Sequence, residues 1–523
     1  MIFRSPYPEV NIPEVPLTRL VLRRVEDLAD KPALVHALTG RVMTYGELGL
    51  MVRRAAAGLR ERGFKKGDVL AIYSPNLLEY AVLFHAVVSL GGIVTTVNPL
   101  YNEDELAAQL NDASAKYLFT IPQLMSAARE AQSRSNVREI FVFGEAEGAT
   151  AFDSLLESEG AVPAVEINVR EDLAALPYSS GTTGVSKGVM LSHYNMAANL
   201  CQMELTDHIA EEDTLIAALP FFHIYGLHVI MNMGLYAGAT LVVMTRFDLE
   251  SFLHSIQRYR VTRAHVVPPI MLALAKQPVV DRYDLSSLKL VMSAAAPLRE
   301  ETSRACTERL KCFVKQGYGM TEASPATHMC PEGVDEIRHG SVGQCVPNTE
   351  CKVVDLETGG ELGPNQEGEI CVRGPQVMLG YLNRPEATLQ AIDADGWLHT
   401  GDVGYADEAG FFYIVDRAKE LIKYKAFQVA PAELEAVLLT HPSVADAAVI
   451  PSPDEEAGEV PKAFVVLKRD ATEEEIKEFV RERVAPFKKI RRVEFIEQIP
   501  KSASGKILRC ILIQRERERK QEE

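Results

Sequence analysis

The sequence has little positive charge for its length. Its 523 residues include 55 lysines and arginines against 72 aspartates and glutamates, which gives a formal net charge of −17. This balance argues against a broad surface for nucleic acid or for an anionic membrane. A ligand that carries phosphate must therefore be bound by particular lysines and arginines. A chain of this length is also longer than a single hydrophobic core usually supports, so at least two domains are expected.

Cysteine pairs at metal-binding spacing are missing as well. The chain has no Cys-x-x-Cys pair and no His/Cys cluster with the spacing of a zinc site. We therefore expect no metal site built from cysteines. Buried thiols in a reducing compartment are predicted instead. The eight cysteines are Cys201, Cys306, Cys312, Cys330, Cys345, Cys351, Cys371 and Cys510.

The sequence also predicts neither a targeting signal nor a membrane span. Residues Met1 to Pro8 lack the apolar core of a signal peptide, and Lys520-Gln-Glu-Glu523 is not a peroxisomal address. The interval from Tyr80 to Asn102 has no formal charge, but Gly91-Gly92 and Pro99 divide it into a helix and a strand. The prediction is a cytoplasmic protein without a membrane-spanning segment.

Strands and helices alternate through the first part of the chain. Thr44 and Glu47 have the spacing of a capping box, which opens an amphipathic helix that ends near Gly63. Asn76 is expected to cap a helix that reaches about residue 90. Buried strands are predicted at 69–73, 93–97, 116–120, 139–143, 240–244, 263–267 and 289–293. This alternation predicts layered α/β sheets whose ligands collect at the carboxyl ends of the strands.

The pattern changes after about residue 340. Short apolar runs separated by glycine and proline predict a β-rich subdomain over about 340–416. The polar segment Arg417-Ala-Lys-Glu420 lies between apolar strands and is the expected hinge. A last unit is predicted to have a helix from Pro431, a strand pair near 447–449 and 463–467, and a helix opened by Thr472 and Glu475. The expected domains are therefore 1–416 and 417–523.

One stretch, Tyr178-Ser-Ser-Gly-Thr-Thr-Gly-Val-Ser-Lys-Gly-Val-Met190, has the composition of a phosphate-binding loop. Glycines allow turns that expose successive backbone N–H groups, hydroxyls add donors, and Lys187 adds positive charge. It is not a Walker loop, because Lys187 lies between Ser186 and Gly188. A flexible linker is the alternative, although a linker seldom leads directly into an apolar run. The candidate phosphate-binding residues are Ser179, Ser180, Gly181, Thr182, Thr183, Gly184 and Lys187.

Two further stretches have residues that a plain scaffold would not need. His223 lies among aromatic side chains in Leu219-Pro-Phe-Phe-His-Ile-Tyr-Gly226, where a satisfied core histidine is the alternative. In Gln316-Gly-Tyr-Gly-Met-Thr-Glu322, glycines bring the backbone close to a flat ligand and a carboxylate follows. Glu322 suits Mg²⁺ bound to ATP, because magnesium takes hard oxygen ligands. A carboxylate that caps a helix is the alternative.

Two stretches nearer the C-terminus complete the set. Asp402 ends Asp395-Gly-Trp-Leu-His-Thr-Gly-Asp402, and a carboxylate on such a turn suits two ribose hydroxyls. An Asx turn explains Asp402 equally well. Lys506 lies in Pro500-Lys-Ser-Ala-Ser-Gly-Lys-Ile-Leu-Arg509, where it would neutralise charge between a carboxylate and a phosphate. Ordinary solvated charge is the alternative for this basic loop.

In kind, order and approximate spacing, these stretches resemble those of the acyl-adenylate-forming enzymes, which include acyl-CoA synthetases, firefly luciferase and peptide-synthetase adenylation domains. The resemblance covers nearly the whole chain and is strongest to the 4-coumarate–CoA ligase and luciferase-like branch. The signatures of this branch are Ile2-Phe-Arg-Ser5, Val267-Pro-Pro269, Tyr283-Asp-Leu-Ser-Ser287, Gln316-Gly-Tyr-Gly-Met-Thr-Glu-Ala323 and Lys423-Tyr-Lys425. It implies an α/β fold with a large N-terminal domain of two layered α/β sheets plus a β-barrel-like subdomain, and a small mobile α+β C-terminal domain.

The resemblance also implies a small-molecule carboxylic acid, ATP and coenzyme A as substrates, with Mg²⁺ as cofactor. The implied catalytic residues are Lys506, His223, Thr183 and Glu322, of which Thr183 and Glu322 bind the metal; Lys419 lies at the hinge. The implied ATP-binding residues beyond the phosphate loop are Ala294, Ala295, Ala296, Gln316, Gly317, Tyr318, Gly319, Met320, Thr321, Asp402, Ile414, Arg417, Lys423 and Lys506. The implied acid pocket consists of Ile224, Tyr225, His228, His265, Met292, Gly317, Gly319, Pro325 and Ala326, and the second-step residues are Lys425, Ala426, Phe427 and Gln428.

The implied reaction has two steps. A carboxylate attacks the α-phosphate of Mg-ATP while Lys506 stabilises the shared charge, and a thiol then displaces AMP. A 4-coumarate-like acid is predicted, although plant coumarate ligases commonly have asparagine and methionine where this chain has His228 and His265. Ala426 stands where close relatives have a glycine beside the pantetheine channel. The alternatives are a medium- or long-chain fatty-acyl-CoA ligase, an enzyme that passes the acyl group to an amine or carrier, and a luciferase-like oxygenase. The sequence carries no signal for oligomeric state.

Overall fold

The computed structural model describes residues 1–160, 164–180, 186–332, 338–418, 420–425, 427–454, 457–502, 505 and 507–522. The chain forms two compact units: a larger unit, Arg4–Glu350 with Arg373–Leu398, and a smaller unit, Met1–Phe3 with Cys351–Val372 and His399–Glu523. The mixed α/β fold, with a large N-terminal and a small C-terminal part, is the predicted one. The expected boundary between residues 416 and 417 stays a prediction. Within the described ranges, no helix has both the length and the apolar character needed to cross a membrane.

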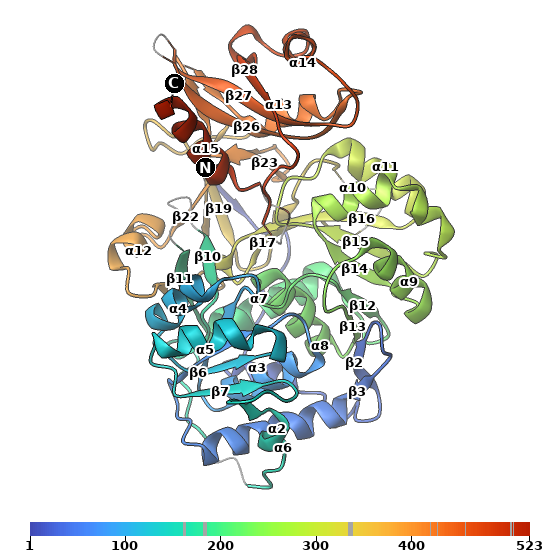
Figure 1. Ribbon diagram of the computed structural model, residues 1–523, viewed down its shortest axis with the longest axis vertical. Coiled ribbons are helices and arrows are strands. Elements are labelled where there is room, and N and C mark those ends of the chain that lie inside the picture. The colour runs from blue at the N-terminus through green and yellow to red at the C-terminus, as the bar shows by residue number, and fades with distance from the viewer. Residues whose placement is uncertain are drawn as a thin grey trace. The chain divides into compact units, whose positions relative to one another are not determined.

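The first sheet of the larger unit has nine strands. They are β4 (Val69–Tyr73), β5 (Ile93–Val97), β6 (Ala115–Thr120), β7 (Glu139–Val142), β8 (Thr150–Ala151), β9 (Leu173–Ala175), β10 (Tyr178–Ser180), β11 (Ser186–Ser192) and β21 (Gly380–Tyr381). Their order is β10-β11-β9-β5-β4-β6-β7-β8, with β21 paired to β11. The central strands β5, β4, β6 and β7 are parallel. Helices α4 (Glu103–Asp112) and α5 (Met125–Ser133) lie against β6 (Figure 1).

The second sheet also has nine strands. They are β2 (Pro32–His36), β3 (Val42–Thr44), β12 (Thr214–Ala217), β13 (Thr240–Val243), β14 (Arg263–Val266), β15 (Leu290–Ser293), β16 (Phe313–Gly319), β17 (Ala326–Met329) and β18 (Gln344–Cys345). Their order is β18-β17-β16-β15-β14-β12-β13-β2-β3. Strands β13, β12, β14, β15 and β16 are parallel, so their carboxyl ends share one edge of the sheet. The candidate segments that begin at Ala294 and Gln316 lie at this edge.

Helices connect the strands and fill the core. In the larger unit they are α1 (Leu17–Val21), α2 (Tyr45–Glu61), α3 (Leu78–Ser89), α6 (Asp153–Leu156), α7 (His193–Asp207), α8 (Met233–Ala237), α9 (Leu249–Tyr259), α10 (Pro268–Lys276), α11 (Glu300–Leu310) and α12 (Pro385–Ala391), together with α4 and α5. Helix α3 is apolar on nearly every side and belongs to a core that includes Ile72 of β4 and Leu215 of β12. This core therefore joins the two nine-stranded sheets.

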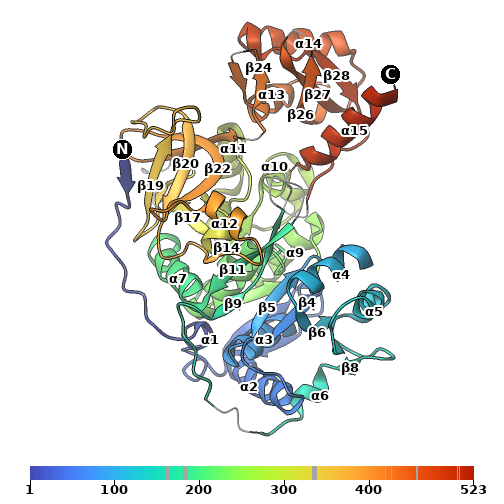
Figure 2. The ribbon, with the colours of Figure 1, turned by 90° about the vertical axis from the view of Figure 1, so that its left-hand side faces the viewer.

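In the smaller unit, successive side chains of one strand pack into two different hydrophobic clusters. Strand β26 (Val444–Asp454) pairs with β27 (Gly458–Leu467), as predicted, and helices α13 (Pro431–Leu438), α14 (Glu473–Arg481) and α15 (Arg509–Glu522) accompany them (Figure 2). Ala447 and Val449 pack with α13 and α14, whereas Ala448 and Ile450 pack with Leu512 of α15. The two-residue period of a strand thus gives each face its own helices. The unit also contains β24 (Ile422–Tyr424), β25 (Phe427–Val429) and β28 (Arg492–Phe495).

A five-stranded sheet forms the β-rich part of the chain. Its order is β1-β19-β20-β22-β23, with β1 (Ile2–Arg4), β19 (Glu350–Val354), β20 (Gly368–Arg373), β22 (Leu398–Ala406) and β23 (Phe412–Arg417). The strands after residue 340 match the predicted β-rich texture. Sequence reasoning missed the pairing of the N-terminal strand β1 with β19, because no local signal joins segments so far apart.

Local predictions had mixed outcomes. The capping boxes at Thr44 and Thr472 are confirmed, and each of the seven predicted buried strands is present. Seven cysteines are buried as predicted, but Cys510 is exposed. The predicted cap at Asn76 is wrong, because α3 begins at Leu78 with Leu77 at the N-cap position. The buried Asn76 amide instead donates to Leu219 O at 2.9 Å and accepts from Phe221 N at 2.7 Å.

Candidate active site

The ends of the predicted phosphate loop lie on a hairpin beside Glu322. Strands β10 and β11 pair antiparallel with Ser179 opposite Lys187. The Ser179 hydroxyl donates to Oε1 of Glu322 at 2.8 Å, and the Tyr381 hydroxyl donates to the same oxygen at 2.9 Å. Nζ of Lys187 lies 4.8 Å from the centre of the Tyr381 ring. The structure therefore brings a lysine, a hydroxyl and a carboxylate of the predicted site together.

This arrangement fits one ligand of a magnesium ion next to phosphate. Glu322 offers a half-buried carboxylate next to Ser179, and Mg²⁺ uses one or two protein carboxylates together with phosphate oxygens. Glu322 follows β16 in a short 3₁₀ turn, Thr321–Ala323. Its carboxylate accepts from the hydroxyls of Ser179 and Tyr381, so these contacts do not give it the alternative role of a helix cap. The predicted ligand Thr183, together with Gly181, Thr182 and Gly184, lies outside the described residues, as does the side chain of Ser180.

Two glycines of the segment that begins at Gln316 lie very close to neighbouring atoms, so that an added Cβ would collide with them. A Cβ at Gly319 would lie 2.1 Å from the carbonyl oxygen of Pro325, and one at Gly317 would lie 2.6 Å from Cε of Met292. Strand β16 pairs with β17 at these positions, with Gly317 opposite Met329 and Gly319 opposite Ala326. Gly319 therefore lets β16 approach the backbone before β17, whereas Gly317 leaves room for the side chain of Met292. The other predicted residues here, Gln316, Tyr318, Met320 and Thr321, follow the same strand and its turn.

The three predicted adenine residues Ala294, Ala295 and Ala296 come directly after β15. Ala295 has φ of 74°, in the left-handed region that side chains with a Cβ disfavour by roughly 1–2 kcal/mol. Backbone strain of this kind persists where the surroundings hold it and tends to occur at functional sites. These residues lie at the carboxyl edge shared by β14, β15 and β16.

The nine predicted acid-pocket residues come from five elements of the larger unit and the residues next to them. Ile224, Tyr225 and His228 lie in or next to a π-helix, Tyr225–Asn232; His265 is on β14, Met292 on β15, Gly317 and Gly319 on β16, and Pro325 and Ala326 at the start of β17. Eight of them are buried and Gly319 is half-buried. His265 is in register with Met292 on the neighbouring strand. A π-helix is rare and frequently marks a functional site.

His223 precedes this π-helix on the loop that Asn76 holds. Its backbone carbonyl accepts from Leu227 N at 2.9 Å, and its Nδ1 accepts from Tyr225 N at 3.4 Å. The ring is half-buried rather than enclosed, unlike that of a core histidine. The predicted role of His223 beside the acyl channel remains a prediction.

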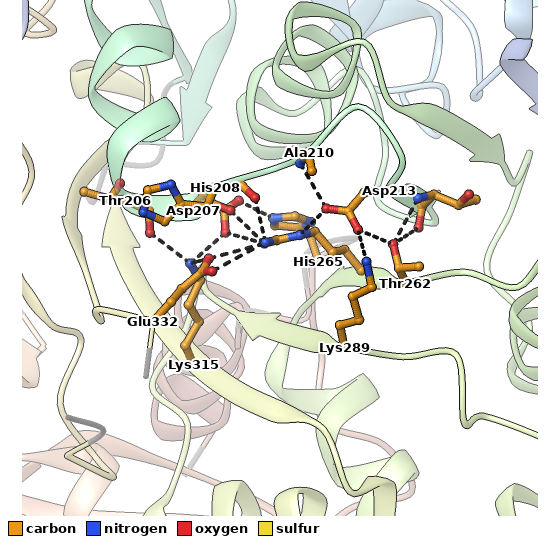
Figure 3. A network of polar contacts seen from close by, with 12 residues as sticks. Thr206, Asp207, His208, Ala210, Asp213, Thr262, His265, Lys289, Lys315 and Glu332 are labelled. Atoms are coloured by element: carbon orange, nitrogen blue, oxygen red, sulfur yellow. Dashed lines mark hydrogen bonds and ion pairs between the residues drawn. The ribbon is translucent and has the colours of Figure 1, made fainter. Parts of the chain in front are cut away.

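A buried ionic network surrounds His265 (Figure 3). Nε2 of His265 lies 2.8 Å from Oδ2 of Asp207, whose Oδ1 lies 2.7 Å from Nζ of Lys315. Arg263 contacts Asp207, Asp213 and Glu332, and Lys315 contacts Glu332 at 2.9 Å. Burial works to raise the pKa of Asp207, but the interactions with its partners, led by Lys315, lower it. Asp207 is therefore an ionised carboxylate in the protein interior.

The predicted ribose residues meet in the smaller unit. Strands β22 and β23 place Asp402 opposite Arg417, and Nε of Arg417 lies 3.3 Å from Oδ1 of Asp402. The turn before Asp402 is fixed by Glu369, which accepts from Gly401 N at 3.0 Å and contacts Nδ1 of His399 at 2.9 Å. The predicted residue Ile414 lies on β23 opposite Gly404. The pair thus presents a carboxylate and a guanidinium side by side.

Strands β24 and β25 pair as a hairpin that includes the predicted ATP-binding residue Lys423 on β24 and the predicted second-step residues Phe427 and Gln428 on β25. Lys423 is opposite Gln428, and its backbone N–H donates to Glu459 at 2.8 Å. Lys425 has φ of 53° and donates its N–H to Ala457 O at 2.8 Å. The base of the lysine loop is closed by a bridge between Lys501 and Ile507. Lys506, Lys419 and Ala426, and the side chains of Phe427 and Gln428, lie outside the described residues.

Sequence reasoning missed two side chains that support the site. Tyr381 lies more than fifty residues beyond its partner Glu322, on a strand of two residues. Asp207 ends a helix and gave no signal of its own. A signal existed for its partners, because Lys315 and Arg263 are cations within buried strands and such charges are almost always paired.

The fold and these sites define a family. The model of the AMP-binding enzyme family matches residues 21–382, and the model of the AMP-binding enzyme C-terminal domain matches residues 433–506. The chain therefore belongs to the AMP-binding enzymes. The hinge residue and the second-step residues predicted above lie between the two matched ranges.

Individual relatives cover nearly the whole chain. It is 46% identical to 4-coumarate–CoA ligase 1 of Petroselinum crispum over 521 residues, which is 97% of this chain and 96% of that protein. Among solved structures, ATP-bound MatB from Rhodopseudomonas palustris has a TM-score of 0.87 and 30% identity, covering 96% of this chain and 99% of that one. The amide bond synthetase McbA from Marinactinospora thermotolerans has a TM-score of 0.84 and 29% identity, covering 95% and 99%.

Proposed function

We propose that this chain is an ATP-dependent carboxylic acid–CoA ligase that forms an acyl-adenylate and then an acyl-CoA thioester. The observation that carries the proposal is the contact between the Ser179 hydroxyl and Glu322, which joins the phosphate loop to a carboxylate suited to magnesium. The 46% identity to a 4-coumarate–CoA ligase over nearly the whole chain supports 4-coumarate or a related hydroxycinnamate as the acid.

In the first step, a carboxylate oxygen of the acid bonds to the α-phosphorus of ATP while the bond to the bridging oxygen breaks and pyrophosphate leaves. Lys187 binds the β and γ phosphates, and Asp402 with Arg417 binds the ribose. Magnesium held by Glu322 and Thr183 would neutralise charge on the phosphates. Lys506 supplies positive charge where the two anions are forced together.

In the second step, the sulfur of CoA bonds to the acyl carbon, and AMP leaves with the electrons of the mixed-anhydride bond. Lys506 is needed only in the first step, so a C-terminal domain over 417–523 can turn on a hinge at Lys419 between the steps. Lys425, Ala426, Phe427 and Gln428 then border the pantetheine arm, and His223 borders the acyl channel. We further propose a cytoplasmic location, which the seven buried cysteines support.

The test is a panel of acids with Mg-ATP, with and without CoA, in which pyrophosphate, AMP and thioester are scored separately. We expect thioester with 4-coumarate, whereas thioester only with aliphatic acids would identify a fatty-acyl-CoA ligase. Emission of light with oxygen would identify a luciferase. Lys506→Ala should abolish pyrophosphate release while largely sparing thioester formation from supplied acyl-adenylate, and equal loss in both steps would contradict the division.

A second candidate function keeps the adenylate but passes the acyl group to an amine. The likeness to the amide bond synthetase McbA and the alanine at position 426 both favour it. In the same panel, pyrophosphate release without thioester, followed by amide formation when amines are added, would select this candidate. If Ala426 restricts the CoA channel, Ala426→Gly should speed thioester release and leave pyrophosphate release unchanged.

A further inference from the structure

Of the described residues predicted for the acid pocket, two bury a polar atom that has no hydrogen-bond partner. Among the described residues, Nδ1 of His265 and the hydroxyl of Tyr225 have no hydrogen-bond partner. Their rings lie edge to face, with centroids 6.3 Å apart. His265 is fully buried and Tyr225 is 5% exposed. A buried polar group without a partner is unfavourable, so each of these atoms needs an explanation, and a ligand that binds there is one.

The hydrogen bond made by Nε2 of His265 determines whether Nδ1 donates or accepts. Asp207 is ionised, so it can only accept a hydrogen bond at Oδ2, and Nε2 of His265 at 2.8 Å must be the donor. In a neutral imidazole the proton on Nε2 leaves Nδ1 as a lone-pair acceptor. Asp207 therefore orients the ring and sets its tautomer.

The network around His265 contains the cations Arg263, Lys289 and Lys315 and the anions Asp207, Asp213 and Glu332. His265 joins this network through Nε2, which contacts Oδ2 of Asp207. Among the described residues Nδ1 has no partner, so the contact with Asp207 holds Nδ1 open in a fixed direction.

The position of His265 decides which end of the acid would meet it. His265 is in register with Met292 on β15, and the predicted nucleotide segment begins two residues later at Ala294. Along β16 the predicted nucleotide residues likewise follow Lys315, which is in register with Met292. The imidazole therefore lies deeper in the sheet than the edge at which ATP is expected. The reacting carboxylate belongs at that edge, so the far end of the acid belongs near His265.

Resting on the function proposed above, we propose that Nδ1 of His265, oriented by Asp207, accepts a hydrogen bond from a hydroxyl on the buried end of the acid. The substrate class is then hydroxyaryl acids, selected over acids that lack the hydroxyl or carry it as a methyl ether. The ring of Tyr225 lies edge to face with that of His265, and its hydroxyl is the other unpartnered polar atom among the described acid-pocket residues. Apolar side chains such as Met292 and Ile224 form the rest of the predicted slot.

His228 provides a matched control. It is a second fully buried histidine among the predicted acid-pocket residues, but both of its nitrogens are engaged. Nε2 contacts Met196 O at 3.0 Å, and Nδ1 contacts Nδ2 of Asn232 at 3.1 Å. Replacing His228 removes an imidazole of equal size without removing an acceptor that is open to the acid.

The test compares kcat/KM for pyrophosphate release with 4-coumarate, cinnamate and 4-methoxycinnamate. The wild type should prefer 4-coumarate over both others by at least about tenfold, because a site built to bind a hydroxyl rejects the analogue that lacks it. In His265→Met this preference should fall at least about tenfold, mainly through loss of rate with 4-coumarate. His228→Met also changes the predicted pocket, but it should lower the preference less than His265→Met does, because both nitrogens of His228 already have partners.

The outcomes separate the inference from the function on which it rests. If no aryl acid releases pyrophosphate, the proposed function fails. If the wild type uses 4-coumarate and cinnamate equally well, the function stands and the inference is overturned, and this measurement needs no variant. An unchanged preference in a folded His265→Met protein, or an equal loss in His228→Met, also overturns it.

Discussion

Nη2 of Arg509 lies 2.9 Å from both carboxylate oxygens of Glu435, and each side chain is about nine-tenths buried. Arg509 opens α15 and Glu435 lies in α13, so the pair fastens the helix after the lysine loop to the helix after the predicted hinge. Glu420 also pairs with Arg509, and Asp416 interacts with it electrostatically. The single positive charge of Arg509 thus interacts with three carboxylates, so this buried cluster has more negative than positive groups.

This excess predicts a pH-dependent stability that depends on Glu435. Burial raises the pKa of Glu435 from 4.5 to about 7, more than Arg509 lowers it. Between these values the folded protein keeps a proton that the unfolded chain has released, so the free energy of unfolding falls as pH rises through the window. The glutamine in Glu435→Gln cannot ionise. In this variant the free energy of unfolding should therefore decrease by about 1–3 kcal/mol less than in the wild type over the same pH range. Denaturant unfolding at several pH values from about 5 to 8 measures it.

The matched control is Glu433→Gln, because Glu433 is an exposed acid on the same helix. It should leave the pH dependence of the free energy of unfolding unchanged. Equal pH dependence in Glu435→Gln and the wild type would show that Glu435 is ionised throughout the window.

The second prediction concerns Glu322 and Tyr381, which share a hydrogen bond of 2.9 Å. Glu322→Gln removes the charge proposed to hold magnesium and should slow pyrophosphate release by about 100-fold or more. Tyr381→Phe keeps that charge and loses one hydrogen bond, so it should cost less than about tenfold and raise the magnesium concentration needed for half the rate. Titrations of rate against Mg²⁺ measure both effects. Equal losses in the two variants would contradict the role given to the charge.

The third prediction compares two glycines on β16 that meet different atoms. A Cβ at Gly319 would meet the backbone oxygen of Pro325 at 2.1 Å, whereas one at Gly317 would meet the flexible end of Met292 at 2.6 Å. Backbone cannot move aside as a methionine can, so Gly319→Ala should destabilise the protein by about 3 kcal/mol and Gly317→Ala by about 1 kcal/mol. Thermal and denaturant unfolding test this order, and a larger loss in Gly317→Ala would reverse it.

The sequence predicted features that depend on residues close together. The capping box of Thr44 and Glu47 needs only residues three apart, and the buried strands needed only short apolar runs. The pairing of Lys315 with Asp207 was out of reach, because the two residues are about a hundred positions apart and the choice of acid depends on the packed fold. Asn76 was assigned to a helix cap for the same reason: its partners, at Leu219 and Phe221, are distant in the chain.

The last prediction concerns the pair of Asp402 and Arg417, which β22 and β23 place side by side. If Asp402 accepts from the ribose hydroxyls, Asp402→Asn should raise the KM for ATP by about tenfold or more, since a hydrogen bond to a charged group is worth about 1.5–3 kcal/mol. With 2′,3′-dideoxy-ATP, which has no such hydroxyls, the variant and the wild type should have similar KM values. Rates of pyrophosphate release measure both. A similar rise in KM with both nucleotides would mean that Asp402 acts through the fold of its turn, which Gly401 and Glu369 also hold, and not through the ribose.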